Sequence, residues 1–268
     1  MFARQKYRAA LTLLALSLLL AAIPCNAQRK ALTVDAVLAR VRENIAEFKK
    51  SVPAFVSDES RLSQHFVNNK LKWGVMTESS FEVKRRGTGE MDESRTIRQV
   101  DGKADKSKKV VLPYTYTGGF ADVLGFVDDK CLTYSLGEVQ GADKTILILG
   151  TPKPASADCH YVPSFSMKAL VDPQSFQILR LEYTVQDANI EGGIAHRKDT
   201  VMTFIAEYAP VELGSKSYWL PKTVIDDVKD KDDRKKPVHL YYEAHYANYH
   251  LFAVSSKLLP GDVVKTQK

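Results

Sequence analysis

The chain has 268 residues, of which 44% are hydrophobic and 26% are charged. These proportions are ordinary for globular proteins and exclude both a wholly disordered chain and a membrane protein with many spans. The net charge of +6 comes from 38 basic and 32 acidic residues, and residues 1–27 hold three of the basic ones and none of the acidic ones. The rest is close to balance, which gives no general reason to expect nucleic-acid binding.

The first 27 residues have the layout of a secretory signal peptide. A short basic segment, 1–8, precedes an apolar one, 9–23, and small residues fit a cleavage site after Ala27. A retained membrane anchor is the alternative, but the apolar segment is short for a bilayer that needs about 20 residues. Lipidation of Cys25 is a further alternative, which Pro24 disfavours. We therefore expect a periplasmic or secreted mature protein with no stable membrane span.

Two cysteines, Cys131 and Cys159, remain after this cleavage, an even count in an oxidising compartment. A disulfide between them would stabilise the fold by about 3–4 kcal/mol in the chain-entropy model. Two separate buried thiols are the alternative. Neither cysteine has a ligand partner at short spacing, so no zinc site is expected.

Residues 33–50 predict an amphipathic helix, because apolar residues recur at helical spacing on one stripe. These are Val34, Val37, Leu38, Val41, Ile45 and Phe48. Thr33 or Asp35 is suited to cap the start, and Pro53 ends the pattern. Residues 119–127 repeat the helical spacing over a shorter stretch, which predicts a short second helix.

After Pro53 the apolar period changes to two, which is typical of strands. Residues 145–149 are apolar on both faces and predict a central strand, and 95–100 alternate weakly before a tight turn at Asp101-Gly102. The inward sets predicted for the other strands are Trp73, Val75, Phe81 and Val83; Phe165, Met167, Ala169 and Val171; Leu179, Leu181, Tyr183 and Val185; Met202, Phe204, Ala206 and Tyr208; Val238, Leu240, Tyr242, Ala244 and Tyr246.

Turn signals separate these sets at Asp172-Pro173, at Gly192-Gly193 and near Gly214. Pro221 lacks an amide donor and should lie at a strand start, a bulge or an edge. Residues 226–236, with five acids and five bases, predict a solvated hairpin tip. The repeated strand and turn signals predict a mainly β (α+β) fold with one antiparallel sheet, in a single domain over 28–268.

No catalytic or phosphate-binding motif is present, so we expect neither an enzyme nor a cofactor. A hydrolase triad is the weakest of the functional hypotheses. His239 and His245 would share one face of a strand but lie roughly 20 Å apart, so they and His250 predict no metal site. The aspartates of 226–236 lack the spacing of a calcium-binding EF-hand loop.

Twelve Tyr, eleven Phe and two Trp are more than a minimal sheet covering needs. One sheet with one main helix leaves either an apolar groove that binds a hydrophobic ligand or a core that the helix fills completely. If a groove exists, its candidate ligand-binding wall residues are Trp73, Phe81, Tyr183, Phe204, Tyr242 and Tyr246.

Several short stretches resemble the outer-membrane lipoprotein carrier and lipoprotein-sorting superfamily, and in particular a secreted bacterial branch of it. They are residues 52–56 (VPAFV), 99–103 (QVDGK), 171–182 (VDPQSFQILRLE), 218–221 (YWLP) and 248–252 (NYHLF). The resemblance implies an incomplete barrel, in which a strongly curved antiparallel sheet wraps around an N-terminal amphipathic helix and a short second helix. In the carriers that hollow holds acyl chains. Phe176 departs from the pattern, because such proteins usually have glycine there.

Two functions follow as expectations. The first is an extracytoplasmic, non-enzymatic binding or carrier protein for a hydrophobic ligand such as a lipid or an acyl chain. The alternative is a cell-envelope protein-interaction module with a solid core and no ligand, whose working surface is a sheet edge or the charged loops. The partners are then a lipid or an envelope protein, and no nucleic acid.

Overall fold

The computed structural model describes residues 32–86, 91–104, 122–138, 145–154, 159, 165–186, 200–231 and 235–252. The chain divides into two compact units, Met1–Thr33 and Val34–Lys268, and all elements described below lie in the second. The predicted signal peptide and the predicted turn at Gly192-Gly193 lie outside the described residues. The domain limits of 28–268 stay a prediction.

The predicted amphipathic helix is confirmed as α2 (Val34–Ser51). Its buried residues are four members of the predicted stripe, Val37, Leu38, Val41 and Ile45. Asp35 in the first turn and the lysines in the last turn suit the helix dipole. None of the described helices combines the length and the hydropathy that a bilayer span requires.

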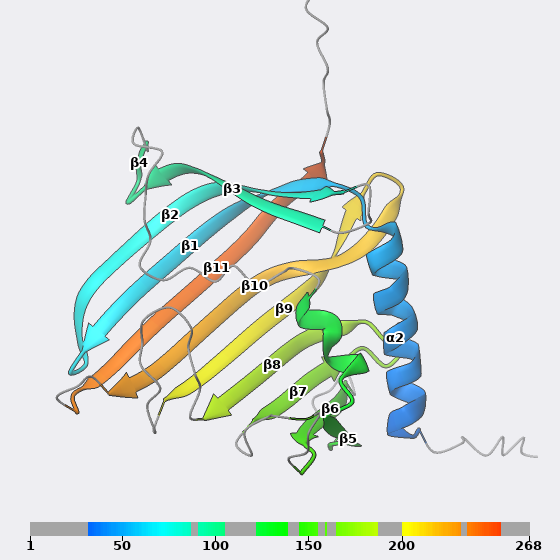
Figure 1. Ribbon diagram of the computed structural model, residues 1–268. Helices are drawn as coiled ribbons and strands as arrows, with labels where there is room; N and C mark the ends of the chain where they lie inside the picture. Colours follow the sequence, from blue (N-terminus) through cyan, green and yellow to red (C-terminus); the bar gives the residue numbers. More distant parts are fainter. Residues whose placement is uncertain are drawn as a thin grey trace, which may run out of the picture. The chain divides into compact units, whose positions relative to one another are not determined.

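The second expected helix is a 3₁₀ helix, η1 (Asp122–Asp128). Phe126 and Val127 are buried in it, and the Arg42 side chain of α2 donates from Nε to the Val127 carbonyl over 2.9 Å. Figure 1 shows η1 and α2 on the same side of the sheet. Residues 119–121 of the predicted helix lie outside the described part of the chain.

Eleven strands form one antiparallel sheet in the described residues (Figure 1). They are β1 (Phe55–Val67), β2 (Lys70–Arg85), β3 (Met91–Val100), β4 (Lys103–Ala104), β5 (Leu132–Leu136), β6 (Ile146–Pro152), β7 (Ser166–Val171), β8 (Ile178–Gln186), β9 (Val201–Leu213), β10 (Lys216–Lys231) and β11 (Pro237–Leu251). The strand order is β4-β3-β2-β1-β11-β10-β9-β8-β7-β6-β5. Only the β1–β11 pairing departs from chain order, so the last strand joins the first.

Because β4 and β5 lie at opposite edges, the sheet of described strands is open. The predicted mainly β fold with one antiparallel sheet is therefore confirmed. The stronger expectation from the resemblance, a strongly curved sheet that wraps around both helices, stays a prediction.

One face of the sheet, the inner face, forms the hydrophobic core together with α2 and η1. Most members of the predicted inward sets are buried on it, among them Val75, Phe81, Val83, Met167, Ala169, Val171, Leu181, Phe204, Ala206, Tyr208, Tyr242, Ala244 and Tyr246. One assignment is wrong. Ile178 is buried where Leu179 was expected, because a register shift pairs Val171 with Ile178 and Leu170 with Arg180, which leaves Leu179 as the extra residue of a bulge.

The turn and bulge predictions that fall on described residues are confirmed. Asp101 and Gly102 have positive φ values of 48° and 74° at the β3–β4 hairpin, as a tight turn requires. Pro221 lies at a register shift of β10, a central strand, as expected for a proline inside a sheet.

The solvated hairpin tip predicted for 226–236 is wrong in its first half. Strand β10 continues to Lys231, and Asp226 and Asp230 are only 4% and 7% exposed. The charged run also alternates with a period of two, so Asp226, Val228 and Asp230 share the inner face. Local composition concealed this period, because charges occupy both faces of the strand.

Candidate functional site

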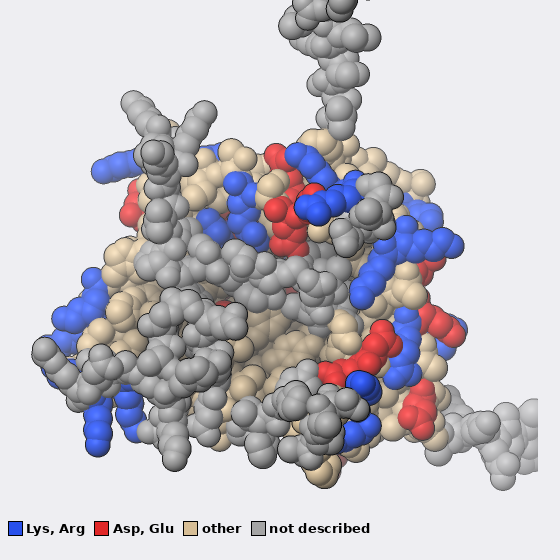
Figure 2. All heavy atoms as spheres, viewed as in Figure 1, with Lys and Arg blue, Asp and Glu red and all other residues tan. Residues whose placement is uncertain are grey.

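The inner face has an apolar part and a polar part. Strands β6 to β10 contribute mainly apolar side chains, whereas β1 and β2 contribute a row of buried polar ones: Ser57, Glu59, Arg61, Ser63, Thr77 and Ser79. Figure 2 shows charged side chains of both signs gathered over β1–β3, and a hollow lined by uncharged atoms over the middle strands β8 and β9. The two kinds of surface therefore adjoin on one face.

Glu59 is the centre of the polar part. It lies on β1, is completely buried, and contacts two arginines. Arg95 of β3 donates from Nε to Glu59 Oε1 over 2.8 Å, and Arg61 Nε lies 3.3 Å from Glu59 Oε2. Arg61 also donates to Thr77 Oγ1 over 3.1 Å. The Glu59 carboxylate thus holds two guanidinium groups, one on its own strand and one two strands away.

The two arginines differ in their access to solvent. The Arg61 side chain is 3% exposed and that of Arg95 is 16% exposed. The Arg95 guanidinium lies 4.6 Å from the centroid of the Phe81 ring, a cation–π contact. Burial by itself would lower the pKa of Arg95, but the Glu59 carboxylate and nearby tyrosines raise that pKa overall, so Arg95 stays charged.

Two phenols from β11 border this cluster. Burial, reinforced by the Glu59 carboxylate, raises the pKa of Tyr242 to about 12, while Arg95 and Arg61 act in the opposite direction. Burial likewise raises the pKa of Tyr246 well above its ordinary value. Both phenols therefore stay protonated near neutral pH. The buried Ser79 hydroxyl has no hydrogen-bond partner among the described residues.

The predicted wall residues fall into two groups on the inner face. Phe81 and Tyr246 lie beside the polar part, with ring centroids 5.3 Å apart, and the Tyr242 side chain is buried there as well. Tyr183 and Phe204 stack at 6.2 Å in the apolar part. Whether any of the five contacts a ligand stays a prediction.

Trp73, the sixth predicted wall residue, is half-buried on β2 and lies outside the hydrophobic core cluster. Its register partner on β1 is His65, further along the strand than the buried pair Ser63 and Val75. Trp73 therefore lies on the predicted face of the strand, but at the end of that face.

A second hollow, the α2 cleft, lies between the C-terminal half of α2 and the starts of β8 and β10. It has a volume of about 240 Å³ and is lined in part by Phe48, Gln177, Tyr218 and Trp219. Hydrogen bonds hold its walls, since the Tyr218 hydroxyl donates to the Ser51 carbonyl over 3.0 Å. None of the six predicted wall residues lines it, and no signal in the sequence predicted the cleft, although Phe48 belongs to the predicted helical stripe and Trp219 to the YWLP stretch.

Phe176 lines the apolar recess that adjoins the α2 cleft. Its φ of 57° is in the left-handed region that favours glycine. The conformation costs a bulky residue roughly 1–2 kcal/mol. Contact with the core and with the Arg40 guanidinium, 5.8 Å from the ring centroid, offsets part of this cost.

His239 and His245 each lie beside a different acid on the outer face. His239 Nε2 is 3.0 Å from Asp227 Oδ1, and His245 Nε2 is 2.9 Å from Glu243 Oε1. Among the residues that the structure describes, no group of three His, Cys, Asp or Glu side chains is placed to hold a metal ion.

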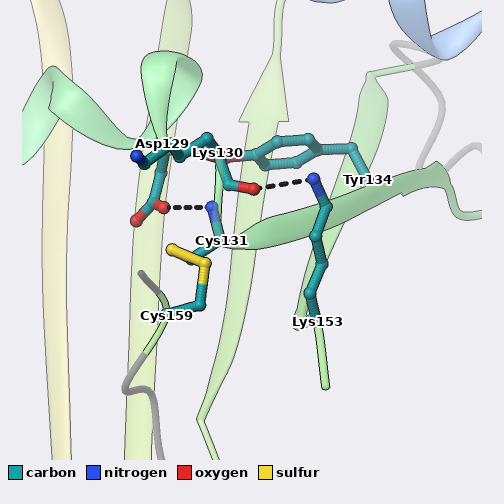
Figure 3. The surroundings of a disulfide bond; sticks show 6 residues. All are labelled: Asp129, Lys130, Cys131, Tyr134, Lys153 and Cys159. Carbon is teal, nitrogen blue, oxygen red and sulfur yellow. Dashed lines mark hydrogen bonds between the residues drawn. A yellow bond between two sulfur atoms is a disulfide. The ribbon is translucent and has the colours of Figure 1, made fainter. Parts of the chain in front are cut away.

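Cys131 and Cys159 form a disulfide, with their Cα atoms 5.3 Å apart (Figure 3). The Cys131 amide donates to Asp129 Oδ1 over 2.8 Å, and Lys153 Nζ donates to the Lys130 carbonyl over 2.6 Å. The bond joins the start of the edge strand β5 to a residue 28 positions later in the sequence.

Replacing both cysteines with alanine should lower the free energy of unfolding by about 3 kcal/mol, because the unfolded chain regains the freedom of the open loop. Urea denaturation of the purified protein measures this. Dithiothreitol should destabilise the wild type to a similar extent and leave the double variant unchanged. Free thiols in the unreduced, denatured wild type would contradict the bond.

No protein-family model matches this sequence, and no curated protein matches it. Similar solved structures include a DUF1329 family protein from Desulfovibrio piger ATCC 29098, with a TM-score of 0.40, 10% identity, and coverage of 84% of this chain and 95% of that chain. The MucA/MucB complex of Pseudomonas aeruginosa gives a TM-score of 0.22 and 8% identity, over 78% of this chain and 94% of the other. A putative outer membrane lipoprotein-sorting protein domain from Vibrio parahaemolyticus has a TM-score of 0.36 and 10% identity, with coverage of 79% of this chain and 90% of that chain.

Proposed function

We propose that this protein is a non-enzymatic, extracytoplasmic binding or carrier protein that holds a hydrophobic ligand, such as a lipid or an acyl chain, on the inner face of its sheet. The supporting observation is the hollow over β8 and β9, which is lined by uncharged residues (Figure 2), together with the half-buried apolar side chains that these strands carry there. The signal-peptide layout of residues 1–27 is the reason for placing the protein outside the cytoplasm.

Burial along the inner face supports this assignment. Inner-face residues near α2, such as Ala206 and Leu181, are almost fully buried, whereas Tyr183 and Val185 of β8 and Met202 of β9 stay half-buried. Tyr183 lies between Phe165, at 5.7 Å, and Phe204, at 6.2 Å, so its ring is held in place. A ligand that covered these side chains would gain roughly 25 cal/mol for each Å² of apolar surface removed from water.

Uptake of the neutral apolar dye Nile red by the folded mature protein tests the proposal. Saturable binding is expected, and replacing Tyr183 with alanine should weaken it about tenfold, since a buried aromatic contact is lost. The matched control is Trp219→Ala, which removes a half-buried aromatic from the α2 cleft and should leave the affinity unchanged. Circular dichroism and urea denaturation confirm that both variants are folded.

The alternative outcomes are distinct. If the dye does not bind to the folded wild type, the core is solid, and the envelope protein-interaction module becomes the better hypothesis. If Trp219→Ala weakens binding and Tyr183→Ala does not, the ligand lies in the α2 cleft and the inner-face assignment is wrong. Native mass spectrometry of the secreted protein provides a second measurement, because a co-purified lipid adds its own mass.

A further inference from the structure

We infer that Arg61 and Arg95 form a subsite for one anionic group, a carboxylate or a phosphate, of an amphipathic ligand whose apolar part lies in the hollow over β8 and β9. This inference rests on the proposed function and adds to it the chemical class of the ligand. The polar part of the inner face is thereby assigned a binding role in addition to its structural one.

The charge balance of the cluster supports an anion. Both guanidinium groups contact the carboxylate of Glu59, so these three side chains carry one more positive than negative charge, while a further buried acid of this face, Asp226, lies opposite Tyr242 on β10. Arg61 and Glu59 are almost completely removed from solvent. A buried charge is costly unless it is paired, so a second anion at this place would be stabilised.

The hydrogen-bonding capacity of the cluster points the same way. In the described residues, the hydrogen bonds from Arg61 and Arg95 to Thr77 and Glu59 all use Nε. Their terminal N–H groups form the fork that binds carboxylate and phosphate oxygens, which only accept hydrogen bonds. The Ser79 hydroxyl, which has no hydrogen-bond partner among the described residues, adds a further donor beside this fork. Tyr242 also keeps its proton, because burial raises its pKa to about 12.

The register of the sheet places this subsite within reach of the hollow. Arg95 is opposite Phe81, Ser79 is opposite Glu59, and Glu59 is opposite Tyr246, so the cluster spans β3, β2, β1 and β11 on one face. From β1 to β9 there are three strand spacings, or roughly 14 Å. An acyl chain of medium length covers that distance. Arg95, the more exposed of the two arginines, is the member open to an incoming head group.

Displacement of Nile red from the mature protein by decanoate and by decanol tests the inference, since the two probes share their chain and differ in charge. Decanoate should displace the dye at a concentration about tenfold lower than decanol, as a charged hydrogen bond predicts. Arg95→Gln should abolish this preference without changing displacement by decanol, and Arg95→Lys should retain part of it. The matched control is Arg98→Gln on the same strand, whose side chain pairs with Asp58 on the outer face and which should keep the full preference.

Inorganic phosphate distinguishes a free anion from a head group. Phosphate alone should not displace the dye. It should raise the concentration of decanoate needed to displace the dye, and it should leave displacement by decanol unaffected. If phosphate binds but displacement of the dye by decanoate is unaffected, the anion site is separate from the site of the hydrophobic ligand and the inference is wrong. Equal displacement by decanoate and decanol would overturn the inference and leave the proposed function intact. If Nile red does not bind at all, both are overturned.

Discussion

Replacing Glu59 with glutamine is expected to lower the free energy of unfolding by about 3–5 kcal/mol. The change keeps the size of the side chain but removes the negative charge, so the buried Arg61 and the partly buried Arg95 lose the carboxylate that both contact. An uncompensated charge in a low-dielectric interior is among the most destabilising changes that a single substitution makes. Urea denaturation followed by circular dichroism gives the value.

Glu82→Gln is the matched control for this experiment. Glu82 lies on β2 and pairs over 2.8 Å with Lys84, whose side chain is 47% exposed. A surface ion pair contributes little, so a loss of less than about 1 kcal/mol is expected. If the Glu59 variant were no less stable than the Glu82 variant, the Glu59 cluster would not be a buried, mutually dependent set of charges.

Replacing Phe55 with alanine is expected to have a similar effect, about 3–5 kcal/mol. Phe55 begins β1 directly after α2 and is completely buried. Its ring centroid lies 5.5 Å from that of Tyr249 and 6.4 Å from that of Phe81, so truncation leaves a cavity between three strands. The thermal or urea unfolding transition of the purified variant measures the loss.

The comparison for Phe55 is an exposed hydrophobic residue. Leu71 on β2 is 53% exposed, and Leu71→Ala should change the free energy of unfolding by less than about 0.5 kcal/mol. Equal effects of the two substitutions would mean that Phe55 is not in the core.

Strongly periodic segments could be predicted from the sequence. In α2 the apolar residues follow a helical period, and in β7 and β9 they follow a period of two, because each segment covers the core with one face only. The sequence also predicted the turn at Asp101 and Gly102 and the bulge at Pro221, because each depends only on the backbone conformation of a few neighbouring residues.

Strand β1 could not be predicted from apolar periodicity. It alternates as regularly as β9, but its inward residues after Phe55 are Ser57, Glu59, Arg61 and Ser63. A search for apolar periodicity passes over such a strand, because the pattern is carried by polar residues whose burial depends on partners elsewhere. The same reason conceals Asp226 and Asp230 on β10.

The sequence by itself determined the elements with apolar periodicity: where the helix begins and ends, which apolar residues share a face, and where the chain turns at residues such as Asp101 and Gly102. The tertiary structure alone decided that β11 lies beside β1, so that the Asn248 side chain donates to Asp58 across 190 positions of sequence. That pairing, with β2 and β3 on the other side of β1, brings Glu59, Arg61, Arg95 and Tyr242 together on one face. Local periodicity fixes the face of a residue within its own strand, whereas its neighbours on that face depend on strand order, which arises only when distant segments pack.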